Sequence, residues 1–354
     1  MQGVRGSNPL TSTKWTAREF PARCWYWESD MSLVSRILSS TPSRVAVASL
    51  TALTLSAAAG TAAFADAPIP PPSPADLNAQ IKLATTKATT ATLGPQILTA
   101  AKSSYEQGPC VQNISSPGNR FTQCDFGSVS AAKTVVLLGD SQASMWLPAF
   151  DAAGKAHGFH VILLARLGCN SNPLVTLSFT GAVDPQCAVF RAASLNLIKT
   201  LHSPIVMFAQ IHRFPLFAKQ KPVPNTTWTS SMVSLFSSLK GAGAKSIAFL
   251  EPAPVDPVDA ATCLSQHLSS SQKCTFSASV GFVNDARAAD EKAATSSRVP
   301  IINTLSLFCT SSVTAPTTKC PAQVNGQLVY ADRWHMSAQY AAYSWRALAA
   351  LAKL

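Results

Sequence analysis

The sequence predicts an α/β protein, a three-layer α/β/α sandwich built around a parallel sheet of five strands. Two observations lead to this fold. Five short apolar segments alternate with longer segments of helical character, which is the order that a parallel sheet with helical crossovers requires. Apolar residues make up 47% of the 354 residues and charged residues only 13%, so the chain is too apolar to be disordered and can form a large core.

The apolar segments predict strands at residues 134–138, 159–165, 205–209, 246–250 and 299–303. Helices are predicted at residues 145–157, 188–201, 228–240, 281–295 and 337–353, and a further helical segment, 75–105, precedes the first strand. A long insertion that contains cysteines, residues 251–280, separates the last two strands. In such a sheet, functional side chains gather at the C-terminal ends of the strands.

Residues 31–65 have the features of a secretory signal peptide: a basic start, an apolar segment at 45–59, and Ala63-Phe64-Ala65 as a cleavage site. We therefore expect a secreted protein of the cell envelope whose mature chain begins at Asp66. A single membrane anchor is the alternative interpretation. No later apolar segment approaches the roughly 20 residues that a membrane span needs.

The rest of the chain divides around this signal. Residues 1–30 precede the signal and match no targeting pattern. We therefore expect Met31 to be the true start of the protein and residues 1–30 to come from an incorrect upstream start. Residues 66–105 read as a proline-rich linker followed by a helical N-terminal extension, and residues 106–354 as the main domain.

The cysteines support export. Cys24 lies in the segment before the signal, and the other eight cysteines fall into four close couples: Cys110 with Cys124, Cys169 with Cys187, Cys263 with Cys274, and Cys309 with Cys320. None forms a CxxC pair, which argues against a zinc ribbon or a thioredoxin-type motif. Four disulfides with sequential pairing are the favoured hypothesis, although eight cysteines permit 105 connectivities.

The formal net charge is +11 for the whole chain and +8 from Asp66 onward. The basic residues are dispersed and accompany no nucleic-acid recognition motif, so we expect no nucleic acid as a partner. An anionic envelope surface or polymer is the partner that such a charge favours.

Two motifs contain residues suited to catalysis. Gly139-Asp140-Ser141 follows the first predicted strand directly, so Ser141 lies at a strand-to-helix turn where its hydroxyl can act as a nucleophile. Asp332 and His335 precede the last helix, and a His with a carboxylate partner can remove the proton of a serine. Taken singly, Ser141 could be only a helix N-cap and His335 only a solvated loop residue. Asp140 is expected to brace the turn.

In the order, spacing and context of these motifs, the chain resembles the SGNH (GDSL-type) hydrolases, whose blocks I and V match Gly139-Asp140-Ser141 and Asp332-x-x-His335. It is most similar to the SGNH domain associated with acyltransferase-3 proteins, here as a stand-alone secreted form. Further shared segments are Trp146-Leu147-Pro148, Gly168-Cys169, Glu251-Pro252-Ala253-Pro254 and Cys309 to Cys320. The resemblance covers about residues 85–354 and implies the flavodoxin-like SGNH hydrolase fold.

The resemblance assigns roles to individual residues. Ser141 would be the nucleophile, His335 the general base and Asp332 the residue that orients it, with the backbone N–H groups of Ser141 and Gly168 binding the oxyanion. The asparagine of block III is missing after the third strand, where Gln210 or His212 lies near its place. Gln142 follows the serine where the acyltransferase-linked domains usually have His.

We therefore expect a monomeric secreted serine esterase that hydrolyses or transfers small O-acyl groups. Its substrate would be an acylated carbohydrate or a small ester, with O-acetyl groups of an envelope glycan as the favoured target. The mechanism needs no cofactor and no metal. The alternative is an accessory protein of the same fold that binds glycans or lipids with a weak or silent active site, and the missing asparagine of block III favours it.

Overall fold

The structure, a computed structural model, divides into Met1–Ala65 and Asp66–Leu354, and every described residue lies in the second unit. The structure describes residues 69–87, 110–112, 117–118, 124–177, 182–211, 223–257, 259–280 and 284–354, with the side chains of 284–286 left out. The predicted signal peptide, Cys24, His212 and residues 88–105 of the predicted helical extension lie outside the described residues.

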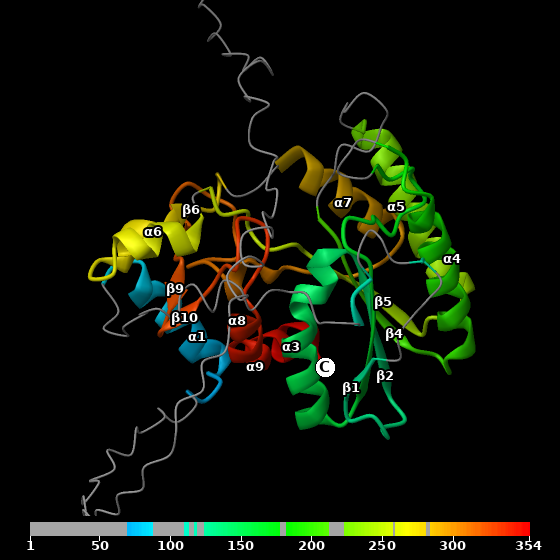
Figure 1. Cartoon of the computed structure of the whole chain (residues 1–354), viewed down its shortest axis with the longest axis horizontal. Helices are drawn as coiled ribbons and strands as arrows, with labels where there is room; N and C mark the ends of the chain where they lie inside the picture. Colours follow the sequence, from blue (N-terminus) through cyan, green and yellow to red (C-terminus); the bar gives the residue numbers. More distant parts are fainter. Residues whose placement is uncertain are drawn as a thin grey trace, which may run out of the picture. The chain divides into compact units, whose positions relative to one another are not determined.

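A six-stranded sheet forms the centre of the fold, and Figure 1 shows its strands with helices on both sides. The strands are β1 (Asp125–Gly127), β2 (Thr134–Gly139), β3 (His160–Ala165), β4 (Ile205–Ala209), β5 (Ser246–Leu250) and β7 (Ile301–Ile302). Their spatial order is β1-β3-β2-β4-β5-β7, and all neighbours are parallel except β1 and β3. The predicted α/β fold with its five parallel strands is confirmed.

The sixth strand was not predicted. The strand β1 pairs antiparallel with β3 and forms the edge of the sheet, and all three of its residues are only half-buried. Three half-buried residues show no hydrophobic periodicity, so the sequence carries no signal for this strand. The last parallel strand is also shorter than predicted, because only Ile301 and Ile302 pair with β5.

Helices cover both faces of the sheet. The central strand β2 alternates between them: Val135 and Leu137 pack into one core, and Val136 and Leu138 into the other. The first core is shared with α1 (Pro74–Ala84), α3 (Ser141–His157), α8 (Ala338–Tyr343) and α9 (Trp345–Ala352), and the second with α4 (Pro185–Thr200), α5 (Asn225–Gly241) and α7 (Asn284–Ser296). This arrangement is the predicted three-layer sandwich.

Helix boundaries differ from the prediction in two places that matter. Helix α3 begins at Ser141 rather than at 145, because the Asp140 carboxylate caps it by accepting the N–H of Gln142. The predicted C-terminal helix is interrupted at Ser344, which ends α8 and begins α9.

The insertion between β5 and β7 has secondary structure of its own. It contains α6 (Ala260–Gln266), the 3₁₀ turn η2 (Ser271–Cys274) and β6 (Phe276–Ser277), and β6 pairs with β8 (Lys319–Cys320). The segment that follows β7 adds the turn η3 (Thr304–Leu307) and a small hairpin of β9 (Gln323–Val324) and β10 (Gln327–Leu328).

Four disulfides join Cys110 to Cys124, Cys169 to Cys187, Cys263 to Cys274 and Cys309 to Cys320. These are the four sequential couples, and each closes a loop of at most 18 residues.

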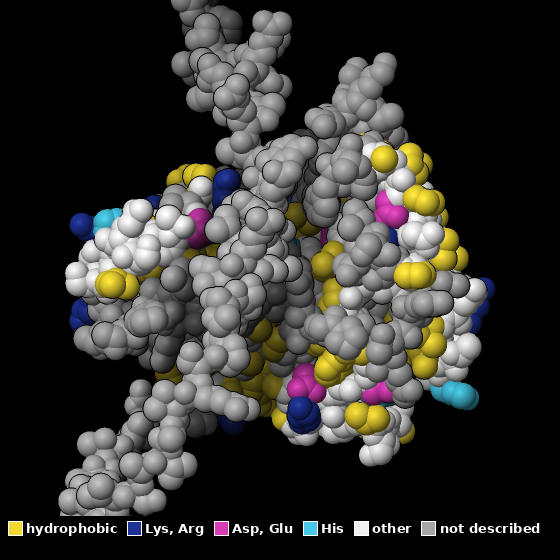
Figure 2. All heavy atoms as spheres, in the orientation of Figure 1, with side chains coloured by type: hydrophobic (Ala, Val, Ile, Leu, Met, Phe, Trp, Pro, Cys, Tyr) yellow, Lys and Arg dark blue, Asp and Glu magenta, His cyan; other side chains and the backbone are white. Residues whose placement is uncertain are grey.

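Among the described helices, none is both long and apolar enough to cross a membrane. Figure 2 shows the molecule from the same side as Figure 1, and on the described part of this face the acidic and basic side chains are scattered.

Candidate active site

The turn after β2 is formed by Gly139, Asp140 and Ser141. A Cβ atom at Gly139 would lie 1.7 Å from the carbonyl oxygen of Ala209 on β4, so only glycine allows the two strands to approach here. Asp140 is fully buried, and its two carboxylate oxygens accept the N–H of Gln142 at 2.8 Å and of Ile211 at 3.0 Å. Asp140 thus ties the end of β2 to the residue after β4.

Burial raises the pKa of Asp140 to about 6, because the loss of water around the carboxylate outweighs the stabilising backbone N–H groups. The two hydrogen bonds that the Asp140 carboxylate accepts agree with its expected role as a brace of the turn. Asp140 holds the turn in place, and its carboxylate is occupied by the backbone.

Ser141 is the first residue of α3, and its hydroxyl oxygen lies 2.8 Å from Nε2 of His335. Both residues are largely buried, with 9% of Ser141 and 8% of His335 exposed. A neutral imidazole that carries its proton on Nδ1 accepts the serine proton at Nε2 in this geometry. The two residues predicted to act together are therefore in hydrogen-bond contact.

Asp332 orients the imidazole. Its carboxylate oxygens lie 2.8 and 2.9 Å from Nδ1 of His335, and Oδ1 also accepts the backbone N–H groups of Trp334 and His335. Burial alone would raise the pKa of this carboxyl group, but the hydrogen bonds and the charge of His335 together lower it below its ordinary value. The ionised carboxylate stabilises the Nδ1–H tautomer that the serine requires.

Two contacts hold this loop against the rest of the fold. The Nε2 amide of Gln142 donates to the carbonyl of Trp334 at 2.8 Å, which links the residue after Ser141 to the residue before His335. Arg333 and Asp256 exchange hydrogen bonds: the Asp256 N–H donates to the Arg333 carbonyl at 2.8 Å, and Arg333 Nε donates to the Asp256 carbonyl at 3.1 Å. Sequence reasoning noted Gln142 only as a departure from the family and missed its contact across the site.

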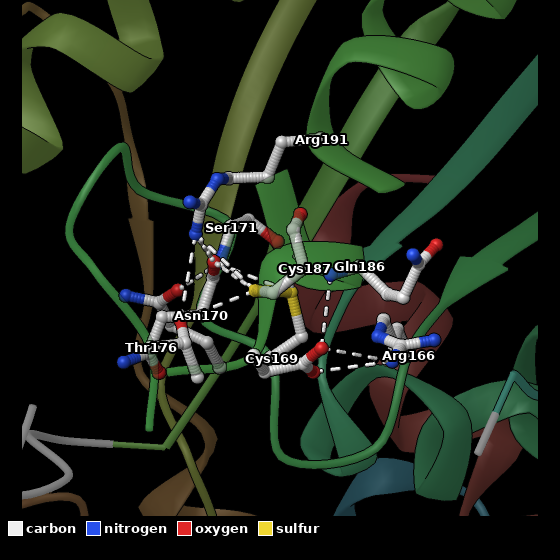
Figure 3. The surroundings of a disulfide bond; sticks show 10 residues. Arg166, Cys169, Asn170, Ser171, Thr176, Gln186, Cys187 and Arg191 are labelled. Carbon is white, nitrogen blue, oxygen red and sulfur yellow. Dashed lines mark hydrogen bonds and ion pairs between the residues drawn. A yellow bond between two sulfur atoms is a disulfide. The ribbon is translucent and has the colours of Figure 1, made fainter. Parts of the chain in front are cut away.

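The loop after β3 contains Gly168, whose φ of +67° lies in the left-handed region that favours glycine. The next residue, Cys169, is joined to Cys187 on α4, and Figure 3 shows Asn170, Ser171 and Arg191 around this disulfide. Within the described part of the chain, no acceptor is recorded for the backbone N–H of Ser141 or of Gly168. The oxyanion role expected of these two N–H groups stays a prediction.

The side-chain amide of Gln210, a predicted oxyanion donor, has partners within the protein. Its Oε1 accepts the N–H of Ser171 at 3.1 Å, and its Nε2 lies 3.1 Å from the sulfur of Met232. Gln210 therefore holds the loop after β3 against β4, the strand that it follows. The other candidate for this position, His212, lies outside the described residues.

Next to this loop, Arg166 forms an ion pair with Asp184 at 3.1 Å, and both side chains are almost fully buried. No sequence pattern singles out this pair, because Arg166 and Asp184 lie on different segments and form no known motif. Among the described residues, no group of three His, Cys, Asp or Glu side chains is placed to hold a metal ion.

Comparison with known proteins identifies a family for this chain. The family described as "SGNH domain (fused to AT3 domains)" matches residues 109–349. No curated protein matches the chain. Among solved structures, the chain is similar to the periplasmic domain of the lipopolysaccharide acetyltransferase of Salmonella ser. Paratyphi A, at 13% identity and a TM-score of 0.53, covering 75% of this chain and 98% of that one. The matched segment contains Ser141, Gly168, Asp332 and His335, and the chain belongs to the family of SGNH domains that occur fused to AT3 domains.

Proposed function

We propose that this protein is an extracytoplasmic serine esterase or acyltransferase that acts on O-acyl groups of a carbohydrate, with O-acetyl groups as the favoured substrate. The family handles acyl groups as hydrolases and transferases. The observation that carries the proposal is the continuous set of hydrogen bonds from the Ser141 hydroxyl through His335 to the Asp332 carboxylate.

In the proposed reaction, His335 Nε2 accepts the proton of Ser141 while Oγ attacks the ester carbonyl carbon. The carbonyl oxygen becomes an oxyanion and is bound by the N–H groups of Ser141 and Gly168. The C–O bond to the sugar then breaks, and His335 returns the proton to the leaving alcohol oxygen. The acyl group remains on Ser141 as an ester.

The second half of the reaction repeats these steps with a new nucleophile. Water attacks the acyl carbon of the acyl-enzyme and gives a proton to His335. The bond from Ser141 Oγ to the acyl carbon then breaks, His335 returns the proton to Oγ, and a carboxylic acid leaves in the esterase reaction. A sugar hydroxyl in place of water gives acyl transfer. The same residues serve both outcomes, so the accessibility of water to the acyl-enzyme determines which one dominates.

Two observations support the substrate class and the compartment. The similar solved structure is named as part of a lipopolysaccharide acetyltransferase and as a periplasmic domain, although 13% identity carries only the fold. Four disulfides are typical of proteins from an oxidising compartment. We infer that the protein acts outside the cytoplasm on an acylated glycan.

The test is hydrolysis of p-nitrophenyl acetate by the full chain and by Ser141→Ala and His335→Ala. Each of these variants should lose at least about 10³-fold in kcat, because the residues of the triad act as a unit. The exposed Ser234→Ala on α5 and the exposed His202→Ala are matched controls that should keep the activity within a few-fold. Equal rates for all five proteins would contradict the proposal.

One observation favours a second candidate function, a binding protein with a weak or silent site. The amide of Gln210 is occupied by Ser171 and Met232, so β4 supplies no third oxyanion donor from this side chain. Such a protein would bind an acetylated glycan with the same affinity in the wild-type and Ser141→Ala forms and would release no acetate. Calorimetry alongside an acetate assay distinguishes this function from catalysis.

A further inference from the structure

We propose that Trp334, together with Arg333, forms the subsite that binds the sugar ring of the substrate beside Ser141 and His335. This inference rests on the proposed function, because it assigns the carbohydrate part of the ester to a surface at the same site.

The first observation is the exposure of the Trp334 side chain. Trp334 is 39% exposed and is the one aromatic residue among the exposed large hydrophobic side chains in the described part of the chain. Trp146 and Trp228 are fully buried, and Trp345 packs against the core. Apolar surface left in water forgoes roughly 25 cal/mol of stabilisation per Å². An exposed indole is therefore unfavourable for the free protein and becomes favourable when a ligand covers it.

The second observation is that the backbone beneath the indole is fixed. The N–H of Trp334 donates to Asp332 Oδ1 at 2.7 Å, and its carbonyl accepts from Gln142 Nε2 at 2.8 Å. The next residue, His335, contacts the Ser141 hydroxyl. The indole thus extends from a preorganised backbone position one residue away from the reacting atoms, and its immobilisation needs little further ordering on binding.

The third observation concerns Arg333, which is exposed like Trp334. Its Nε donates to the Asp256 carbonyl at 3.1 Å and its own carbonyl accepts the Asp256 N–H, so this residue is also fixed. For its two Nη groups, the described residues provide no recorded partner. A guanidinium in this state offers several N–H donors in one plane.

This pair of side chains fits a pyranose ring. One face of a pyranose carries C–H groups that an indole can cover, and its edge carries oxygens that accept from a guanidinium. A protein or membrane partner would require a contiguous apolar patch of several hundred Å². Trp334 instead follows Asp332 and Arg333 in the sequence and precedes His335, all of which are polar, so a sugar is the partner that this surface favours.

The experiment compares two esters on the full chain. Substrates are p-nitrophenyl acetate, which has no sugar, and glucose acetylated on O6. In Trp334→Ala, the ratio of kcat/KM for the sugar ester to that for the small ester should fall about tenfold, mainly through KM, which corresponds to about 1.4 kcal/mol for the lost aromatic contact. Trp334→Phe should restore most of the ratio, and Leu268→Ala, a change of another exposed apolar residue, should leave it unaltered.

A binding measurement separates failure of this inference from failure of the proposed function. Oligosaccharides of acetylated xylan are titrated into Ser141→Ala and into Ser141→Ala/Trp334→Ala. Weaker binding by the double variant supports the subsite even if the wild-type chain hydrolyses neither ester, in which case only the proposed function fails. Equal binding by both proteins, or an unchanged ratio of the two esters in Trp334→Ala, overturns the inference.

Discussion

The hydroxyl of Ser141 and Nε2 of His335 lie 2.8 Å apart although the two residues are 194 positions apart in the sequence. Ser141 is fixed at the start of α3, and His335 is fixed by the loop before α8. Helices α3, α8 and α9 share one core, so the packing of the C-terminal helices against α3 brings the two residues together.

Asp332→Asn should lower kcat by about 10² to 10⁴-fold with little change in fold. The Asn oxygen can still accept the N–H groups of Trp334 and His335, but an amide N–H facing Nδ1 favours the tautomer that carries the proton on Nε2. That tautomer cannot accept the proton of Ser141. Asp259→Asn, the same change at the N-cap of α6, is the control for p-nitrophenyl acetate kinetics. A kcat within threefold of wild type for Asp332→Asn would contradict the role of Asp332.

The Cys169–Cys187 disulfide should affect activity as well as stability. Replacing both cysteines by Ala should lower the free energy of unfolding by about 3 kcal/mol, from the entropy of an 18-residue loop. It should also lower kcat by up to about 10²-fold, because Gly168 precedes Cys169 and its N–H is the proposed oxyanion donor.

The Cys263–Cys274 disulfide is the matched control, since it spans 11 residues in the insertion between β5 and β7. Its removal should lower the free energy of unfolding by almost as much as removal of Cys169–Cys187. The shorter loop makes the loss smaller by about 0.4 kcal/mol. The wild-type kcat should be kept. Denaturant unfolding and ester hydrolysis on both double variants check this, and equal kcat losses would contradict the assignment of Gly168.

Gly139→Ala should destabilise the fold by at least about 3 kcal/mol, because the new methyl group would lie 1.7 Å from the carbonyl oxygen of Ala209 and would force β2 and β4 apart. Gly158→Ala is the control at the C-terminal end of α3. Its Cβ would meet nothing within 4 Å, so only the left-handed φ of +68° opposes it, at about 1 kcal/mol. Thermal unfolding of the two variants should rank them in this order.

Asp140 should make the stability depend on pH. Its pKa rises from 3.8 to about 6 on folding, so between these values the folded protein holds a proton that the unfolded chain has lost. The contribution of Asp140 to the free energy of unfolding is complete below pH 3.8. It falls by roughly 3 kcal/mol as the pH rises to 6. Unfolding measured from pH 4 to 7 should show this decline in the wild type. Asp140→Asn should lack it, and an identical decline in both proteins would exclude Asp140 as its source.

The sequence by itself determined the order along the chain of the five parallel strands and of the helices between them, and it contained the two motifs. Buried strands such as 205–209 are continuous apolar segments that few other structures accommodate, so their existence and parallel pairing could be read directly. The catalytic role of Ser141, Asp332 and His335 remains a prediction from these motifs, although the structure brings the three side chains into contact.

Only the tertiary structure decided how the site is held. The contact of Gln142 with Trp334 and the use of Gln210 on Ser171 join segments 192 and 39 residues apart, and no local pattern encodes such pairings. The antiparallel strand β1 is likewise too short to be recognised from periodicity. Secondary structure follows from local residue patterns, whereas hydrogen bonds between distant loops depend on packing, and therefore they appear only once the chain has folded.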